Sequence, residues 1–474
     1  MYSTRKSLSP LPVHLSTRVA PELQDRILDN LHDSKKDLST CSIVCKSWLP
    51  TCRFHLFAEV VYNPEFARFF DSSMHALNSI APYIKQVIMK GPFSQKDETY
   101  ISPHSILRLG TVFKLHIQTF NWENHEALYS TSFIFSMPET IFSHHLTSLT
   151  LRFIIFPSFT VLTALLDAFV VLQELSIFDV TWGAHHNSGG NASNQSTVLK
   201  QSTLKKLCIE SCNNRGLLNW LLYGVMSEAT FPNLNQGEQP HRSFPYLVAL
   251  TIHDILPGEG DILTGFMAAL GESLEHLEVG FLPYNNRNIN DSRVIISIQI
   301  FSNYLLIFLG ITNAVNLASN VNLKTVTIRQ LMLYQFPSPE IGTVGGFTAD
   351  PFVLAPNEPP YACIPALLST IQSHHLQIIT FYIWLSAEFH LDSVNWSQLA
   401  DLFNGLEVPR IHFSITGTEL ALVKDWFRKR LRTIDSTKTT LEFTRGWFNR
   451  WRLLLLSYEW AHTQFHCSNS TSLE

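Results

Sequence analysis

One spacing of apolar residues returns along most of the chain after residue 60. An apolar residue is followed by two others, a second apolar residue, one further residue and a third apolar residue, as in residues 146–151. The last two apolar positions lie on one face of an extended strand, because successive side chains point to opposite faces. Each copy therefore predicts a short strand with one buried face. Ten copies begin at Ile84, Val112, Leu146, Leu172, Leu204, Leu247, Leu274, Leu323, Leu376 and Val408.

The stretches between copies are long enough for a helix, and the apolar stretch 159–170 is an example. One strand and one helix per unit is typical of a leucine-rich-repeat-like solenoid, in which each unit buries its apolar face against its neighbours. We therefore predict an α/β fold class, with an irregular leucine-rich-repeat-like strand–helix solenoid over residues 61–434. An ordinary doubly wound α/β sheet is the competing architecture.

The repeat is degenerate. Ordinary leucine-rich repeats place Asn or Cys three positions after the last strand residue. Here that position holds Phe120, Ile154, Val180, Cys212, Ile255, Leu282, Leu331 or Trp384. Polar or Gly- and Pro-rich stretches near 183–201, 230–245 and 332–360 indicate loop insertions, because connections in compact domains are usually about 4–6 residues long. Residues 435–474, which are rich in Trp and Arg, are expected to form a C-terminal cap or tail, with a lipid-surface helix as the alternative.

A different periodicity occupies the start of the chain, after an expected flexible N-terminus at residues 1–15. Leu23, Ile27 and Leu31 recur at i, i+4 and i+8, which places them on one stripe of a helix. Pro21 suits the first turn of that helix, where its missing N–H costs nothing. Asp37 is expected to cap a second helix over 38–44, and a third helical piece follows over 45–57. Three helices this short make a small core, which favours burial against a partner.

At residues 16–60 the sequence resembles an F-box. The family pattern is Leu-Pro-x-Glu-Leu, a helix, a Leu, and then Val-Cys-Lys/Arg-x-Trp. The matching segments here are Pro21-Glu22-Leu23, Ile27-Leu28, Leu31, Leu38 and Val44-Cys45-Lys46-Ser47-Trp48. Ala20 stands where the family usually has Leu, and no spacer residue separates Pro21 from Glu22. The following residues are similar to F-box proteins abundant in mushroom-forming (basidiomycete) fungi; a generic helical cap is the alternative.

The resemblance implies an N-terminal three-helix F-box and a non-catalytic role. The chain would be a substrate-recognition subunit of an SCF-type cullin–RING ubiquitin ligase. Its F-box would bind a Skp-type adaptor, and through it a cullin, while the repeats would bind an unknown target protein. The alternative is a scaffold or membrane-associated repeat protein with a vestigial F-box. The adaptor-binding positions implied by the match are Pro21, Leu23, Ile27, Leu28, Leu31, Leu38, Val44 and Trp48.

The expected target-binding surface consists of strand residues that alternate with the core positions. The pairs are Thr150 and Arg152, Ser176 and Phe178, Cys208 and Glu210, Thr251 and His253, Glu278 and Gly280, Thr327 and Arg329, and Thr380 and Tyr382. From these pairs, the candidate target-binding residues are Arg152, Phe178, Glu210, His253, Glu278, Arg329 and Tyr382.

Composition narrows the class of protein. The chain is 45% hydrophobic and 15% charged, against about 25% charged in typical domains. A mostly disordered chain is therefore excluded, and a net charge of −5 lacks the basic surface of a dedicated nucleic-acid binder. Seven scattered cysteines and the absence of a signal-like N-terminus favour the cytoplasm or nucleus. The uncharged segment 294–322 is expected to be a buried helix leading into a strand, with a membrane span as the alternative.

The sequence contains no motif that carries chemistry. It has no His-Glu-x-x-His, no Cys-x-x-Cys, no phosphate-binding loop and no nucleophile elbow. Adjacent histidines such as His185 and His186 point apart on a strand or helix, so they chelate a metal poorly. The basic run within 419–432 is expected to be a solvated helix face. We therefore expect no metal, no cofactor and no catalytic residue.

Overall fold

The structure is a computed structural model of the chain. It describes residues 20–44, 46–62, 80–90, 119–123, 146–156, 158–167, 169, 171–182, 203–212, 214–223, 244–255, 259–281, 315–333, 363–385, 391 and 394–446. The chain divides into two compact units, Met1–Leu204 and Lys205–Glu474.

The described part of the first unit begins with three helices, α2 (Pro21–Asp29), α3 (Lys35–Val44) and α4 (Leu49–Phe57), which we call the helix trio. Its parallel strands then follow in chain order: β1 (Glu59–Tyr62), β2 (Gln86–Lys90), β3 (Thr119–Glu123), β4 (Ser148–Arg152) and β6 (Glu174–Phe178). The 3-10 turn η1 (Ala81–Tyr83) precedes β2, and helix α9 (Phe159–Asp167) connects β4 to β6. The short strands β5 (Ile155–Phe156) and β7 (Thr181–Trp182) form a separate pair.

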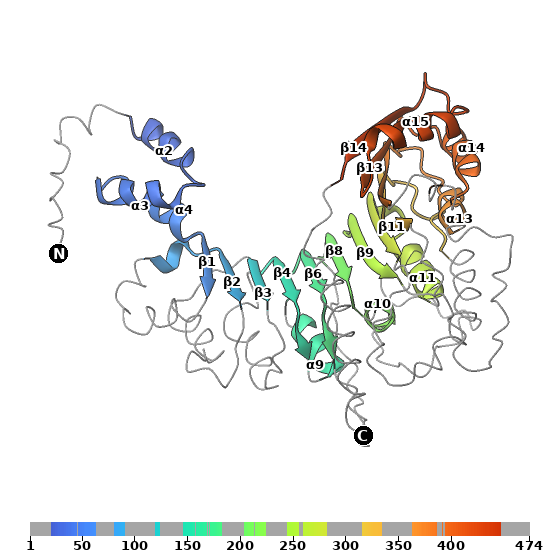
Figure 1. The fold of residues 1–474 in the computed structure, drawn as a ribbon. Coiled ribbons are helices and arrows are strands. Elements are labelled where there is room, and N and C mark those ends of the chain that lie inside the picture. Colours follow the sequence, from blue (N-terminus) through green and yellow to red (C-terminus); the bar gives the residue numbers. More distant parts are fainter. Residues whose placement is uncertain are drawn as a thin grey trace, which may run out of the picture. The chain divides into compact units, whose positions relative to one another are not determined.

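The second unit repeats the same plan. Its strands are also parallel and in chain order: β8 (Lys206–Glu210), β9 (Ala249–Ile255), β10 (His276–Phe281), β11 (Thr325–Leu333), β12 (Ile378–Leu385), β13 (Arg410–Thr416) and β14 (Thr440–Arg445). The connections contain α10 (Asn214–Tyr223), α11 (Gly260–Leu270), η4 (Gly271–Ser273), α13 (Cys363–Ser369), α14 (Trp396–Leu406) and α15 (Leu420–Arg430). These helices lie along one side of the strands (Figure 1). The predicted mixed α/β class, with parallel strands and connecting helices, is confirmed.

The core lies between strands and helices. In β4, β6 and β8 the apolar positions are buried and the residues between them are partly exposed. At the C-terminal end the rings of Phe381, Phe413 and Phe443 stack across three neighbouring strands, with centroids 5.3 Å apart at each step. Phe427 of α15 stacks on Phe413 at 4.4 Å. The alternation therefore buries one face of the strands under the helices and leaves the other face partly exposed.

Two local features recur from one strand–helix repeat to the next. The residue that leaves or bends the strand has a left-handed backbone at Phe153, Asp179, Ser211 and Asp254, with φ between 50° and 58°. This turn redirects the chain, and after Phe153, Asp179 and Asp254 the next residue is buried in the core. Side-chain hydroxyls also connect successive strand–helix repeats. Ser373 donates to the Leu323 carbonyl at 2.7 Å, and Thr439 donates to the Val408 carbonyl at 2.8 Å.

Several details differ from the sequence-based expectation. Helix α2 ends at Asp29, before Leu31, and α4 begins at Leu49, after the expected start at residue 45. The copy placed at Val112 has the wrong register, because β3 begins at Thr119 and Phe120 pairs with Val87. The strands β1 and β14 were not predicted, and β14 extends the parallel sheet beyond residue 434. The second helix begins three residues earlier than expected, because Ser34 and not Asp37 is its cap: the Asp37 N–H donates to Ser34 Oγ at 3.4 Å.

Candidate interaction surfaces

The helix trio holds itself together with a small core and a row of side-chain hydrogen bonds. Leu28, Leu38 and Cys52 are fully buried. Side chains of α2 form hydrogen bonds with Trp48, which precedes α4, and with α4 itself. Trp48 Nε1 donates to Gln24 Oε1 at 2.8 Å, and Thr51 Oγ1 donates to Asp25 Oδ1 at 2.7 Å. His55 Nε2 lies 2.8 Å from Asp29 Oδ1. These contacts fix α4 against α2 and leave the apolar stripe of α2 free to face outward.

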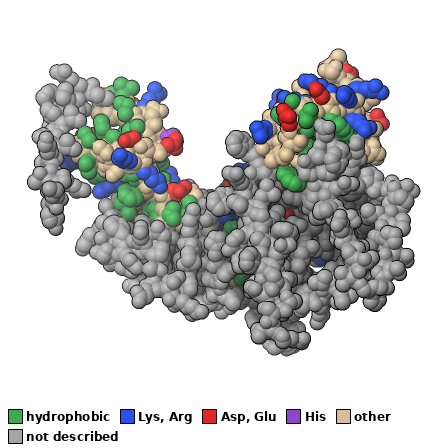
Figure 2. Space-filling model, in the orientation of Figure 1, with side chains coloured by type: hydrophobic (Ala, Val, Ile, Leu, Met, Phe, Trp, Pro, Cys, Tyr) green, Lys and Arg blue, Asp and Glu red, His purple; other side chains and the backbone are tan. Residues whose placement is uncertain are grey.

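Large apolar side chains remain exposed on this trio. Leu23 and Ile27 are 53% and 51% exposed, and Ile43 of α3 is 76% exposed. Leu23 and Ile27 are four residues apart, so they are neighbours on one helix face. Phe54 is 39% exposed and lies under the Lys85 ammonium, 4.7 Å from the ring centroid. Figure 2 shows hydrophobic side chains at the surface of these helices. These exposed apolar side chains make the trio a candidate interaction site.

The predicted adaptor-binding residues fall into three groups by exposure. Pro21, Leu23 and Ile27 are exposed, while Leu31, Val44 and Trp48 are half-buried. Leu28 and Leu38 are fully enclosed among the helices and contribute to the core of the trio. Cys45 of the motif lies outside the described residues.

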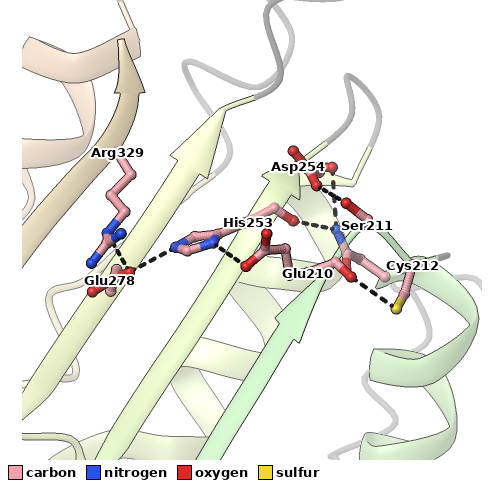
Figure 3. A network of polar contacts seen from close by, with 8 residues as sticks. Glu210, Ser211, Cys212, His253, Asp254, Glu278 and Arg329 are labelled. Atoms are coloured by element: carbon pink, nitrogen blue, oxygen red, sulfur yellow. Dashed lines mark hydrogen bonds and ion pairs between the residues drawn. The ribbon is translucent and has the colours of Figure 1, made fainter. Parts of the chain in front are cut away.

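Four candidate target-binding residues of the second unit form a continuous polar row across β8, β9, β10 and β11 (Figure 3). His253 Nδ1 lies 3.1 Å from Glu210 Oε2, and His253 Nε2 lies 2.8 Å from Glu278 Oε1. Arg329 Nε lies 2.6 Å from the same Glu278 oxygen. Among the described residues this nitrogen has no hydrogen bond of suitable geometry, so the contact is an ion pair. We call Glu210, His253, Glu278 and Arg329 the strand row.

The electrostatics of the strand row centre on His253, whose side chain is only 6% exposed. Burial by itself lowers the pKa of His253, but the hydrogen bonds to Glu210 and Glu278 and the charges of these carboxylates outweigh it. The pKa of His253 is therefore raised. The charged imidazole is favoured because it can donate to a carboxylate from each nitrogen.

The remaining candidate residues form cation–aromatic pairs. The Arg329 guanidinium lies over the Tyr382 ring at 4.4 Å and so extends the strand row to β12. In the first unit, the Arg152 guanidinium lies over the Phe178 ring at 4.1 Å. Each pair joins neighbouring strands and orients a cation that stays partly exposed. All seven candidates thus contact another candidate in the same unit.

A buried polar cluster next to the strand row was not predicted from the sequence. Ser211 Oγ donates to Asp254 Oδ2 at 2.6 Å, and Asn214 Nδ2 lies 3.2 Å from Glu259 Oε2. Asn214 also reaches the carbonyl of His253 at 3.3 Å. The cluster fixes the left-handed turns after β8 and within β9, and so it positions Glu210 and His253. Polar residues at matching positions after Ile209 and Ile252 were the available signal.

No group of three or more His, Cys, Asp or Glu residues able to hold a metal ion occurs in the part of the chain that the structure describes. Among the same residues, no helix has the length and apolar character needed to cross a membrane. Of the uncharged segment 294–322, residues 294–314 lie outside the described residues.

Comparison with known proteins adds little. No protein-family model matches the chain, and no curated protein matches it. A solved structure, the Rad7 and Elc1 complex in yeast, aligns over 92% of this chain and 98% of its own, at 12% identity and a TM-score of 0.29. A TLR13–ssRNA13 complex aligns over 76% of this chain and 54% of its own, at 11% identity and a TM-score of 0.22. Both TM-scores are too low to indicate a shared fold, so neither similarity indicates what the chain binds.

Proposed function

We propose that the chain is the substrate-recognition subunit of an SCF-type cullin–RING ubiquitin ligase. The helix trio would be its F-box and would bind a Skp-type adaptor. The observation that carries this proposal is the exposed apolar pair Leu23 and Ile27 on α2, within a segment whose sequence resembles an F-box. Apolar anchors of this kind contribute most of the energy of an interface when they enter a pocket on the partner.

The exposed and buried residues of the trio would have separate roles in that interface. Leu23 and Ile27, joined by Ile43, would contact the adaptor directly. Leu28 and Leu38 would support the contact from the core, and Trp48 would support it through its hydrogen bond to Gln24. Because the α2–α4 contacts fix the helices beforehand, little conformational entropy would be lost on binding.

The strand–helix units would form an irregular leucine-rich-repeat-like solenoid that holds the target. Strand order that follows chain order within each unit favours a solenoid, because a doubly wound sheet reverses its strand order at a switch point. The recurring left-handed turns and hydroxyl links favour a repeated unit as well. The strand row and Tyr382 would belong to the target surface. Ubiquitin transfer would be the work of other subunits, and this chain would not itself be an enzyme.

Co-purification with a Skp-type adaptor tests the proposal. We expect the wild-type chain to retain the adaptor and an Ile27→Asp variant to lose it, because a buried unpaired carboxylate opposes docking. Leu422→Asp is the matched control, since Leu422 is 52% exposed on α15 and is not part of the trio. Circular dichroism should show that both variants fold like the wild type.

Two outcomes would contradict the proposal. One is a wild-type chain that retains no adaptor. The other is an Ile27→Asp variant that binds as well as Leu422→Asp. Either result would leave the scaffold with a vestigial F-box as the better account of the chain.

A further inference from the structure

The strand row contains one side chain whose protonation decides how many strands it connects. His253 lies on β9, Glu210 on β8 and Glu278 on β10. The two ring nitrogens of His253 each contact a different carboxylate, at 3.1 and 2.8 Å. The imidazole therefore lies between two acceptor groups from the two neighbouring strands.

The number of protons in this arrangement follows from the donors and acceptors. An ionised carboxylate only accepts hydrogen bonds, and a neutral imidazole has a single N–H to donate. Two ionised carboxylates are therefore both satisfied only by the doubly protonated ring. With that proton the strand row alternates in sign, as Glu210, His253, Glu278 and Arg329, and its formal charge is zero. Without the proton the formal charge is −1.

We propose that His253 is a proton-dependent clasp of the target surface. As an imidazolium it joins β8, β9 and β10 through Glu210 and Glu278. When the proton leaves, the ring can donate to only one of these carboxylates, and the other is released from it.

The groups facing the clasp are consistent with this behaviour. Glu210 and Cys208 come from β8, Glu278 from β10, and Arg329 reaches Glu278 from β11. Arg329 places a positive charge beside the Glu278 carboxylate, on the side away from His253. The raised pKa of His253 agrees with this geometry.

The direction of the pH effect follows from that raised pKa. The stabilisation from the clasp is fully present below the pKa of His in the unfolded chain, about 6.5. It is lost as the pH rises through the higher pKa of the folded chain. Under the proposed function, on which this consequence rests, the target surface would become more negative and less rigid over the same range. A target with basic groups would then bind with a pH dependence set by His253.

Histidine-selective NMR titration of the full chain tests the clasp without adaptor or target. The His253 resonance is identified by its absence in His253→Gln. We expect it to titrate above about 6.5 in the wild type, and to titrate lower in Glu210→Gln and Glu278→Gln. An unperturbed or lowered pKa in the wild type would overturn the proposal, as would a pKa unchanged in both glutamine variants.

Thermal unfolding provides a second measurement that does not depend on resonance assignment. From pH 6.5 upward through the folded pKa, we expect the Tm of the wild type to fall further than that of His253→Gln. His412→Gln is the control, because His412 lies on the same strand face but pairs with the Thr444 hydroxyl at 2.8 Å. A His412→Gln variant that removes the same pH dependence would contradict the clasp. A positive titration together with failed adaptor binding would overturn the proposed function and leave the clasp in place.

Discussion

The helix trio and the strand–helix repeats differ in how far they bury their apolar side chains. In the described strands the alternating apolar positions are mostly buried, and Phe381, Phe413 and Ile415 are at most 1% exposed. In the trio, Leu23, Ile27 and Ile43 stay at the surface while polar pairs hold α2 to α4. A small element that leaves apolar side chains exposed and fixes its helices with hydrogen bonds agrees with the proposal that a partner covers it.

The largest expected effect comes from the aromatic stack. Phe413 contacts Phe381, Phe427 and Phe443, so Phe413→Ala leaves a cavity that three strands and a helix surround. We expect a loss of about 3–5 kcal/mol. Hydrogen exchange should rise in β12–β14 and remain unchanged in α2–α4. A parallel rise in the trio would show that the two regions unfold as one and would break the comparison.

A smaller loss of stability is expected at the turn after β13, where the backbone closely approaches the end of β12. Gly417 has a φ of 97°, and a Cβ there would lie 2.2 Å from the Leu385 carbonyl oxygen. Gly417→Ala should cost about 2–3 kcal/mol, since it adds both backbone strain and a backbone clash. Gly405, near the end of α14, is the control because a Cβ there meets nothing within 4 Å. Urea unfolding should show Gly405→Ala as neutral or slightly stabilising; equal losses at both positions would be contrary to this account.

The trio should separate stability from binding within one helix. Leu28→Ala removes a fully buried side chain and should cost about 2 kcal/mol, at the low end for Leu→Ala because the small core can partly collapse. Leu23→Ala should change stability by less than about 0.5 kcal/mol while weakening adaptor binding. Urea unfolding and adaptor affinity, measured on both variants, check this division. A Leu23→Ala variant that destabilises the chain as much as Leu28→Ala would mean that the stripe is structural.

The repeat was predictable because it depends on local spacing, and its errors have local causes. Residues 112–117 and 117–122 both carry the same spacing, so the sequence offered two registers, and only the pairing of β2 with β3 selects the second. Strand β14 was not predicted because Lys438 occupies the position where the repeated spacing requires its first apolar residue.

For the candidate site, the sequence predicted which residues share a strand face but not which of them contact one another. Alternation placed Glu210, His253 and Arg329 on the outward face, but their contacts depend on cross-strand reach. Gly280 pairs with Arg329, yet the carboxylate that Arg329 meets is that of Glu278, two residues earlier. The cluster around Ser211 and Asp254 depends on left-handed turns that the spacing of apolar residues does not encode.

The smallest expected loss of stability concerns a hydrogen bond of the trio and tests whether such bonds, as well as apolar burial, stabilise it. Gln24 Oε1 accepts from the Trp48 indole, which is half-buried, so water can partly replace the lost acceptor in Gln24→Met. We expect a cost of about 1 kcal/mol. A double-mutant cycle with Trp48→Phe isolates the pair, because the coupling energy excludes effects that each substitution has alone. A coupling near zero would show that this hydrogen bond does not stabilise the trio and that buried side chains such as Leu28 and Leu38 do. It would then be harder to argue that the exposed apolar stripe is unnecessary for the folding of the trio.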